Sequence, residues 1–300
     1  MARTATRFSC TACGESLPKW EGRCPSCEAW GTVQEEVATL SSSRRGLATP
    51  REVVALADVD ALEAERIATG IGELDRVLGG GIVPGSLVLL GGEPGVGKST
   101  LLTMALASIA QRAPALLVTG EESAAQVRLR AERIGGAGDI RVVAETDLDA
   151  VVATIAKERP AVCVVDSVQT LWTADLASAP GSVAQVREAA GGLLRVAKEH
   201  GVAIVLVGHV TKDGAVAGPK VLEHLVDAVL LFEGERGGEL RVVRAAKNRF
   251  GATSELGVFA MTGRGLEAVE DPGALLGRDE LGDRKSTRLN SSHEWISRMP

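Results

Sequence analysis

The chain has 300 residues, a net charge of −6 and a pI of about 5.4. Hydrophobic residues make up 45% of it and can fill a large core, although only 3% of the residues are aromatic. The acidic balance excludes a globally basic surface, so any nucleic acid must be bound by local basic loops. No apolar run reaches the roughly 18 residues of a transmembrane helix, and no signal peptide is visible after the first arginines. We therefore expect a cytoplasmic protein that has no membrane partner and no structural disulfide.

Four of the five cysteines form two C-x-x-C pairs near the N-terminus: Cys10, Cys13, Cys24 and Cys27. Two such pairs can give four thiolates to one tetrahedral ion, which is typical of structural Zn²⁺. A redox dithiol pair or an iron–sulfur site is the alternative interpretation. We expect residues 1–33 to form a zinc ribbon whose folding depends on the metal. Cys163 lies in an apolar run and is predicted to be a small buried residue.

Residues 34–55 contain a Ser- and Arg-rich stretch and are predicted to link the ribbon to a main domain at 56–272. That domain begins with a short predicted helix at 69–81 between glycines. Further on, predicted strands alternate with predicted helices: strands at 86–90, 115–119, 140–144, 161–165 and 202–207, and helices from 101, at 123–134, 147–159 and 181–200. This alternation predicts an α/β fold with a mainly parallel, buried sheet and helices on both faces. Short runs at 228–232, 240–245 and 257–261 predict β-rich additions at one edge.

Between the strand at 86–90 and the following helix lies the phosphate-binding pattern G-x-x-x-x-G-K-[ST]. Its glycines let several backbone N–H groups point at one anion, and the helix N-terminus adds partial positive charge. Lys98 would reach the β- and γ-phosphates of ATP, and Ser99 would ligate Mg²⁺. A Gly-rich turn with a chance lysine is the alternative. The predicted nucleotide-binding residues are Gly92, Glu93, Pro94, Gly95, Val96, Gly97, Lys98, Ser99 and Thr100.

Carboxylates follow two of the other predicted strands. Asp166 ends the strand at 161–165 and is expected to hold Mg²⁺ through water, from a strand directly beside the phosphate-loop strand. It could instead cap a turn. Glu121 and Glu122 follow the strand at 115–119, where one of them could orient the attacking water or simply favour a helix start. The spacing from the strand end favours Glu122 as the catalytic residue.

Three further motifs narrow the range of protein families that the chain can resemble. They are Val207-Gly208-His209-Val210-Thr211-Lys212-Asp213-Gly214, Ala217-Gly218-Pro219-Lys220 and Lys247-Asn248-Arg249-Phe250-Gly251. Together with the ribbon, the phosphate loop and Val165-Asp166-Ser167-Val168-Gln169-Thr170, residues 8–269 resemble the RadA (Sms) family of bacterial DNA repair proteins. The resemblance implies a RecA-like ATPase core, a fold shared with ring-forming helicases. It also implies that the protein assembles as a homo-oligomeric ring, a hexamer. It also implies DNA-dependent ATP hydrolysis, movement on single-stranded DNA, and branch migration of branched recombination intermediates together with the RecA recombinase.

The resemblance also assigns roles to single residues. Lys247 and Arg249 would act at the subunit boundary, on the neighbour's γ-phosphate or on DNA, since a cation delivered in trans stabilises charge in phosphoryl transfer. A basic edge loop is the alternative. His209 would sense the γ-phosphate, or it is only a satisfied polar residue. Lys212 and Lys220 lie in a Gly-rich segment and are predicted to contact the DNA backbone, which gives sequence-tolerant and salt-sensitive binding.

Two further expectations concern the end of the chain and the class of function. Members of the family continue into a Lon-protease-like domain, whereas 273–300 is expected to be a truncated junction with a non-native tail, which has four basic residues and one acidic residue from 284 onward. A non-motor RecA-like ATP switch that gates protein partners is the alternative function. A zinc-dependent interaction module with a vestigial nucleotide site is a third, which intact Lys98 and Asp166 argue against.

Overall fold

The computed structural model describes residues 5–10, 16–26, 28–38, 65–136, 138–209, 222–234 and 238–269. The chain divides into two compact units, Met1–Ala268 and Val269–Pro300, and only Val269 of the second unit is described. Within these ranges no helix combines the length and the apolar character needed to cross a membrane. The predicted tail at 273–300 lies outside the described residues, as do Cys13, Cys27, Lys212 and Lys220.

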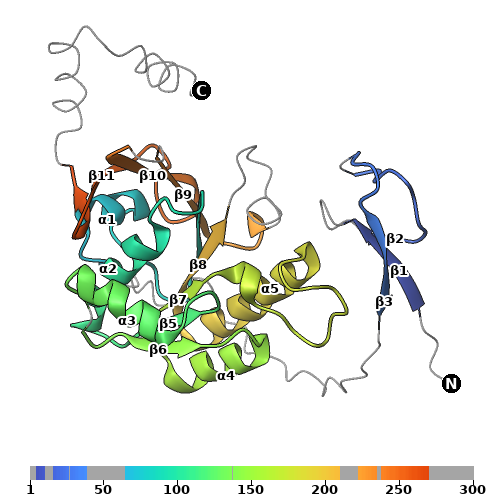
Figure 1. The fold of residues 1–300 in the computed structure, drawn as a ribbon, viewed down its shortest axis with the longest axis horizontal. Helices are drawn as coiled ribbons and strands as arrows, with labels where there is room; N and C mark the ends of the chain where they lie inside the picture. The colour runs from blue at the N-terminus through green and yellow to red at the C-terminus, as the bar shows by residue number, and fades with distance from the viewer. Residues whose placement is uncertain are drawn as a thin grey trace, which may run out of the picture. The chain divides into compact units, whose positions relative to one another are not determined.

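The N-terminal part forms a three-stranded antiparallel sheet in the order β2-β1-β3 (Figure 1). Strand β1 (Ala5–Cys10) pairs with β2 (Ser16–Leu17) and with β3 (Val33–Ala38). Cys10, Leu17, Cys24 and Val33 form its small buried core. Because β3 stays paired with β1 as far as Ala38, the ribbon extends beyond the boundary predicted at residue 33.

A nine-stranded sheet organises the described part of the main domain (Figure 1). Strands β9, β4, β8, β7, β5 and β6 run parallel, and β10, β11 and β12 are added antiparallel at the edge beside β9. This arrangement confirms the predicted mainly parallel sheet with β-rich additions at one edge. In spatial order the strands are β12 (Gly265–Ala268), β11 (Leu256–Thr262), β10 (Leu240–Asn248), β9 (Ala228–Glu233), β4 (Leu87–Gly92), β8 (Ala203–His209), β7 (Val162–Asp166), β5 (Ala115–Thr119) and β6 (Arg141–Ala144).

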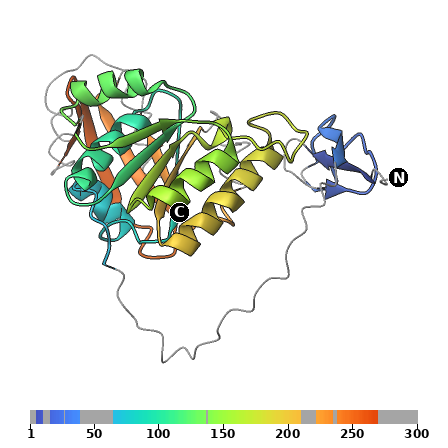
Figure 2. The same cartoon turned by 90° about the horizontal axis from the view of Figure 1, so that it is seen from below.

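Helices cover both faces of this sheet (Figure 2). Successive strand residues point to opposite faces, so Val88 and Leu90 join one core while Leu87 and Leu89 join the other. The first core includes side chains of α1 to α3, and the second includes side chains of α4 and α5. The helices are α1 (Gly72–Leu78), α2 (Lys98–Ala110), α3 (Ala124–Arg133), α4 (Leu148–Glu158) and α5 (Val183–His200), with a 3-10 turn η2 (Val168–Thr170).

The strand that carries Asp166 does not lie beside the phosphate-loop strand, so that prediction was wrong. Strand β8 lies between β4 and β7, and its Val205 is paired with Val88 on one side and with Val164 on the other. The return through α5 inserts β8 into this position, and chain order alone does not reveal such an insertion. With neighbouring strands about 4.8 Å apart, β4 and β7 are separated by about 10 Å. The end of β8, at His209, is thereby placed between the two.

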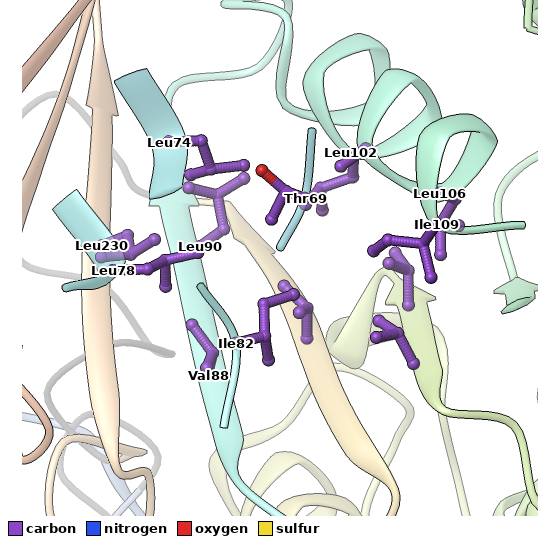
Figure 3. A pocket seen from close by; sticks show the side chains of 14 residues that line it. Thr69, Leu74, Leu78, Ile82, Val88, Leu90, Leu102, Leu106, Ile109 and Leu230 are labelled. Carbon is purple, nitrogen blue, oxygen red and sulfur yellow. The ribbon is translucent and has the colours of Figure 1, made fainter. Parts of the chain in front are cut away.

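A small cavity of about 20 Å³ lies in the core between β4 and α2 (Figure 3). Apolar side chains line it, among them Val88 and Leu102, and the hydroxyl of Thr69 at its border is engaged with the backbone of Ile71. A void of this size and character offers a water molecule no hydrogen-bonding partners. We therefore interpret it as a packing defect and not as a ligand site.

Candidate nucleotide site

The phosphate loop leaves β4 at Gly92 and enters α2 at Lys98. Its glycines are required by the backbone at two positions. A Cβ atom on Gly92 would lie only 2.4 Å from the carbonyl oxygen of Phe232, and Gly97 adopts φ 112°, in the left-handed region. The loop therefore has a close approach to β9 and a turn that side chains would disfavour.

The start of α2 differs from the starts of α3, α4 and α5. Those helices are capped by the side chains of Ser123, Asp147 and Ser182. Helix α2 has no side-chain cap and no acidic residue in its first turn. Its first N–H groups have no acceptor inside the helix, and the positive end of the helix dipole lies there as well. This donor set fits a phosphate group.

Lys98 is buried and folded back onto its own loop. Its Nζ donates to the carbonyl oxygens of Gly92 at 2.8 Å and Glu93 at 2.9 Å, and lies 3.4 Å from Nδ1 of His209. Burial lowers the pKa of the Lys98 ammonium, while the negative charges of Asp166 and Glu121 oppose that shift. The cation is therefore held at the mouth of the loop, with both carboxylates close to it.

Glu121 lies at the centre of a chain of polar contacts at this end of the sheet. Its Oε1 accepts a hydrogen bond from Ser167 Oγ at 2.6 Å and lies 3.0 Å from Nε2 of His209. Burial favours the neutral carboxyl, but the hydrogen bonds from Ser167 and His209 and the charges of His209 and Lys98 bring the pKa of Glu121 below its ordinary value. An ionised carboxylate therefore lies beside the phosphate loop.

Glu122 points elsewhere, contrary to the sequence-based preference for it as the catalytic residue. Its carboxylate pairs with Arg130 of α3, and its backbone N–H and C=O both bond the hydroxyl of Thr119. These contacts fold the turn after β5 and direct the Glu122 side chain towards α3. The structure thus brings Glu121, and not Glu122, to Lys98 and His209.

Asp166 and Ser99 are the predicted Mg²⁺ ligands. Asp166 is buried at the end of β7, and its charge acts on Lys98. Ser99 lies in the first turn of α2, next to Lys98. Both offer oxygen atoms, which Mg²⁺ prefers, so the donor set fits this ion.

Arg241 supports the loop and was not singled out by the sequence. It is buried on β10, where its Nε donates to the carbonyl oxygen of Val96 at 3.0 Å and its Nη1 to those of Gly238 and Leu240, both at 2.8 Å. The strand pattern gives no indication that one of its basic residues turns inward. The guanidinium ties the tip of the phosphate loop to the antiparallel edge of the sheet.

Lys247 and Arg249 lie at the other end of the sheet from Lys98. Arg249 Nη1 donates to Asp227 Oδ1 at 3.1 Å, and Asp227 bonds the backbone of Leu87, the first residue of β4. Leu87 and Gly92 are five strand steps apart, about 17 Å, which exceeds the reach of an arginine side chain. Lys247 Nζ donates to the carbonyl oxygens of Glu223 and, at 2.8 Å, Val226. Neither cation can reach the phosphate loop of its own chain.

The ribbon holds the two described cysteines of the predicted zinc site in its core. Cys10 ends β1, with its Sγ 3.2 Å from Thr32 Oγ1, and Cys24 opens a turn closed by a hydrogen bond from Glu28 N to its carbonyl oxygen. Both thiols are buried in the small cluster with Leu17 and Val33. Buried sulfur at a tight turn fits the knuckle of a structural zinc site.

Comparisons with known proteins match both parts of the chain. Residues 49–215 match the AAA domain family, and residues 8–35 match the rubredoxin metal binding domain. The crystal structure of the RadB recombinase is similar in fold, with a TM-score of 0.54 and 24% identity over 68% of this chain and 100% of that one. The match supports the RecA-like architecture.

Bacterial proteins named DNA repair protein RadA are similar over almost the whole sequence. The identity is 54% with that of Pseudomonas aeruginosa, over 92% of this chain and 62% of the relative. It is 47% with that of Halalkalibacterium halodurans, over 95% and 63%, and 43% with that of Bacillus subtilis, over 98% and 66%. The chain thus spans less than two thirds of the length of these relatives.

Proposed function

Because the chain belongs to the AAA domain family and is similar to bacterial RadA proteins over most of its length, we propose that it is a DNA-dependent ATPase of recombinational repair. It hydrolyses ATP to move on single-stranded DNA and promotes branch migration of recombination intermediates together with RecA. The observation that carries the proposal is the convergence of Lys98, Glu121 and Asp166 at the start of α2. A cation, a general base and a Mg²⁺ ligand are what phosphoryl transfer to water requires.

We propose the following roles in hydrolysis. The residues 92–100 cradle the phosphates with backbone N–H groups, and Lys98 exchanges its two carbonyl partners for phosphate oxygens. Ser99 and Asp166 hold Mg²⁺, which neutralises charge on the phosphates when it is bound. Glu121 orients the attacking water and accepts its proton, because its carboxylate is ionised and lies beside the loop.

His209 connects this chemistry to the adjoining segment of the chain. It bridges Lys98 and Glu121 and is the last residue of β8. A γ-phosphate that recruits Lys98 removes one of its partners, so His209 is suited to sense the nucleotide. The residues that follow in the sequence include Lys212 and Lys220, for which we propose contacts with the DNA backbone.

The site is completed by a second subunit. Lys247 and Arg249 cannot reach their own loop, and Arg249 is about half exposed, so we propose that they act on the nucleotide of the neighbour in a homo-oligomeric ring, a hexamer. Such an arrangement makes hydrolysis depend on assembly.

The ribbon holds Zn²⁺ through Cys10, Cys13, Cys24 and Cys27, and the protein acts in the cytoplasm.

ATP turnover with and without single-stranded DNA, across a salt series, tests the motor function. We expect stimulation by DNA that weakens as salt rises, because phosphate contacts release counterions. If the rate of ATP turnover is the same with and without DNA, at protein concentrations where a ring forms, the result would favour the alternative, an ATP switch that gates protein partners.

Two variants test the site itself. Lys98→Ala should abolish turnover, and Arg249→Ala should lower it strongly. A mixture of the two should recover activity, because Arg249 of one subunit then serves the intact loop of the other.

A further inference from the structure

Arg249 is held at the amino end of β4 by a buried carboxylate that it shares with a second cation. Asp227 is 6% exposed, and its Oδ1 accepts from Arg249 Nη1 at 3.1 Å. Its Oδ2 accepts from Lys198 Nζ of α5 at 3.1 Å and from the backbone N–H of Leu87 at 3.0 Å. The carbonyl oxygen of Asp227 also accepts from the backbone N–H of Arg249. The backbone and the side chain of Arg249 are thus both held by one residue.

We infer that Asp227 positions Arg249 for its action on the neighbouring subunit, and that Lys198 allows Arg249 to leave Asp227 when the neighbour's nucleotide arrives. The set formed by Asp227, Lys198 and the Leu87 N–H is here named the Asp227 clasp. This inference rests on the proposed action of Arg249 in trans. Neither Asp227 nor Lys198 touches the phosphate loop, so both are positioning residues.

The charge balance of the clasp makes the release possible. A buried carboxylate is costly when it loses its counter-charge, so an isolated Asp227–Arg249 pair would resist separation. Lys198 supplies a second positive charge, and the Leu87 N–H is a fixed donor. When Arg249 moves to a phosphate, Asp227 therefore remains paired. The same partners lower the pKa of Asp227 against the effect of its burial, which keeps the carboxylate ionised.

The exposure of the cations fits this exchange. Arg249 is 54% exposed and Lys198 is 53% exposed, whereas the carboxylate between them is buried. Arg249 uses one guanidinium nitrogen on Asp227, and a guanidinium has five N–H donors in a planar fork. The clasp therefore fixes the backbone and one nitrogen, and the remaining donors can address a phosphate.

Mixed oligomers test the clasp. A donor subunit carries Lys98→Ala and an acceptor subunit carries Arg249→Ala, so restored turnover uses Arg249 of the donor and the loop of the acceptor. Asp227→Asn in the donor should lower restored turnover by up to about 100-fold, because a misplacement of a reacting group by about 1 Å can cost that much. The same substitution in the acceptor should have little effect, because its Arg249 side chain is already absent. Lys198→Met should show the same dependence on placement.

If Asp227 and Lys198 only stabilised the fold, their substitution would give different turnover in the mixed oligomers. Equal losses in both placements would overturn the inference, and so would no loss in either. Lys198 is half exposed, so Lys198→Met keeps the test valid if Asp227→Asn fails to fold. Lys157→Met, at an exposed lysine of α4, is the matched control and should be neutral in both placements. If the Lys98→Ala and Arg249→Ala subunits, with no change at Asp227 or Lys198, restore no turnover when mixed, both the action in trans and the role of the clasp are wrong. If this mixture restores turnover, but the effect of the Asp227 and Lys198 substitutions does not depend on which subunit carries them, only the role of the clasp is wrong.

Discussion

Glu121 and His209 meet at the carboxyl end of the parallel strands, with Glu121 Oε1 3.0 Å from His209 Nε2. His209 ends β8, which lies between the strand of the phosphate loop and the strand of Asp166. Its other ring nitrogen faces Lys98 at 3.4 Å. One imidazole therefore joins the phosphate-loop lysine to the proposed general base, and it can do so only because β8 is inserted between β4 and β7.

Adjacent glutamates give a matched test of the general base. Glu121→Gln should lower turnover by about 10²- to 10⁴-fold, the usual contribution of a positioned base, while ATP binding persists. Glu122→Gln should leave most of the turnover, because Glu122 pairs with Arg130 and faces away from Lys98. Single-turnover hydrolysis and binding of a fluorescent nucleotide measure the two effects. The reverse ranking of the two variants would restore Glu122 as the base.

Stability should depend on pH through the same carboxylate. The pKa of Glu121 is below its ordinary value of 4.5, so the folded state binds fewer protons there than the unfolded state. The stabilisation is therefore fully present above the ordinary value and is lost as the pH falls through the folded-state value. Urea midpoints at about pH 7 and about pH 4 should differ more in the parent chain than in Glu121→Gln. Parallel losses in the two proteins would contradict this.

The strand and helix assignments could be predicted because they depend on local periodicity. The strand predicted at 115–119 has the bounds of β5, Ala115–Thr119, and Ser123 caps α3 as predicted. Strand β12 was missed, since Gly265–Ala268 is short and has no β-branched residue to mark it. Whether a strand or helix could be predicted thus depended on residues that are close together in the sequence.

The features that could not be predicted depend on contacts between distant segments. The order of β4, β8 and β7 follows from how α5 packs, and the choice between Glu121 and Glu122 follows from a pairing with α3. Asp227 directly precedes a predicted strand and belongs to no motif, yet it joins β4, α5 and Arg249. The roles of Ser99, Asp166, Lys247 and Arg249 stay predictions.

The small core cavity predicts that one added methylene will stabilise the protein. Val164 lines the cavity and Val165 faces the opposite core, although they are neighbours in β7. Val164→Ile should raise the free energy of unfolding by up to about 1 kcal/mol, because it fills a void. Val165→Ile should instead lower it by about 1–3 kcal/mol through overpacking. Urea unfolding compares them, and equal effects would show that the cavity does not accept the methyl group.

The ribbon should fold only with its metal, independently of the α/β domain. Its described core holds two cysteines and few apolar side chains, too little to be stable alone, so metal binding must supply the folding free energy. Cys24→Ser should therefore remove most of the bound zinc and unfold the ribbon, while the urea midpoint of the α/β domain stays unchanged. Zinc content, near-ultraviolet circular dichroism of Trp20 and Trp30, and urea unfolding follow the two parts.

Cys163 provides the control, because it lies in the core of the α/β domain, where burial raises the pKa of its thiol. Cys163→Ser places a hydroxyl in apolar surroundings and should lower the stability of that domain by about 1–3 kcal/mol. The zinc content should not change, and native Cys163 should resist thiol reagents until the domain unfolds. The two substitutions thus have opposite signatures, since one affects metal and ribbon and the other affects domain stability alone. Full zinc content in Cys24→Ser would contradict the four-thiolate site.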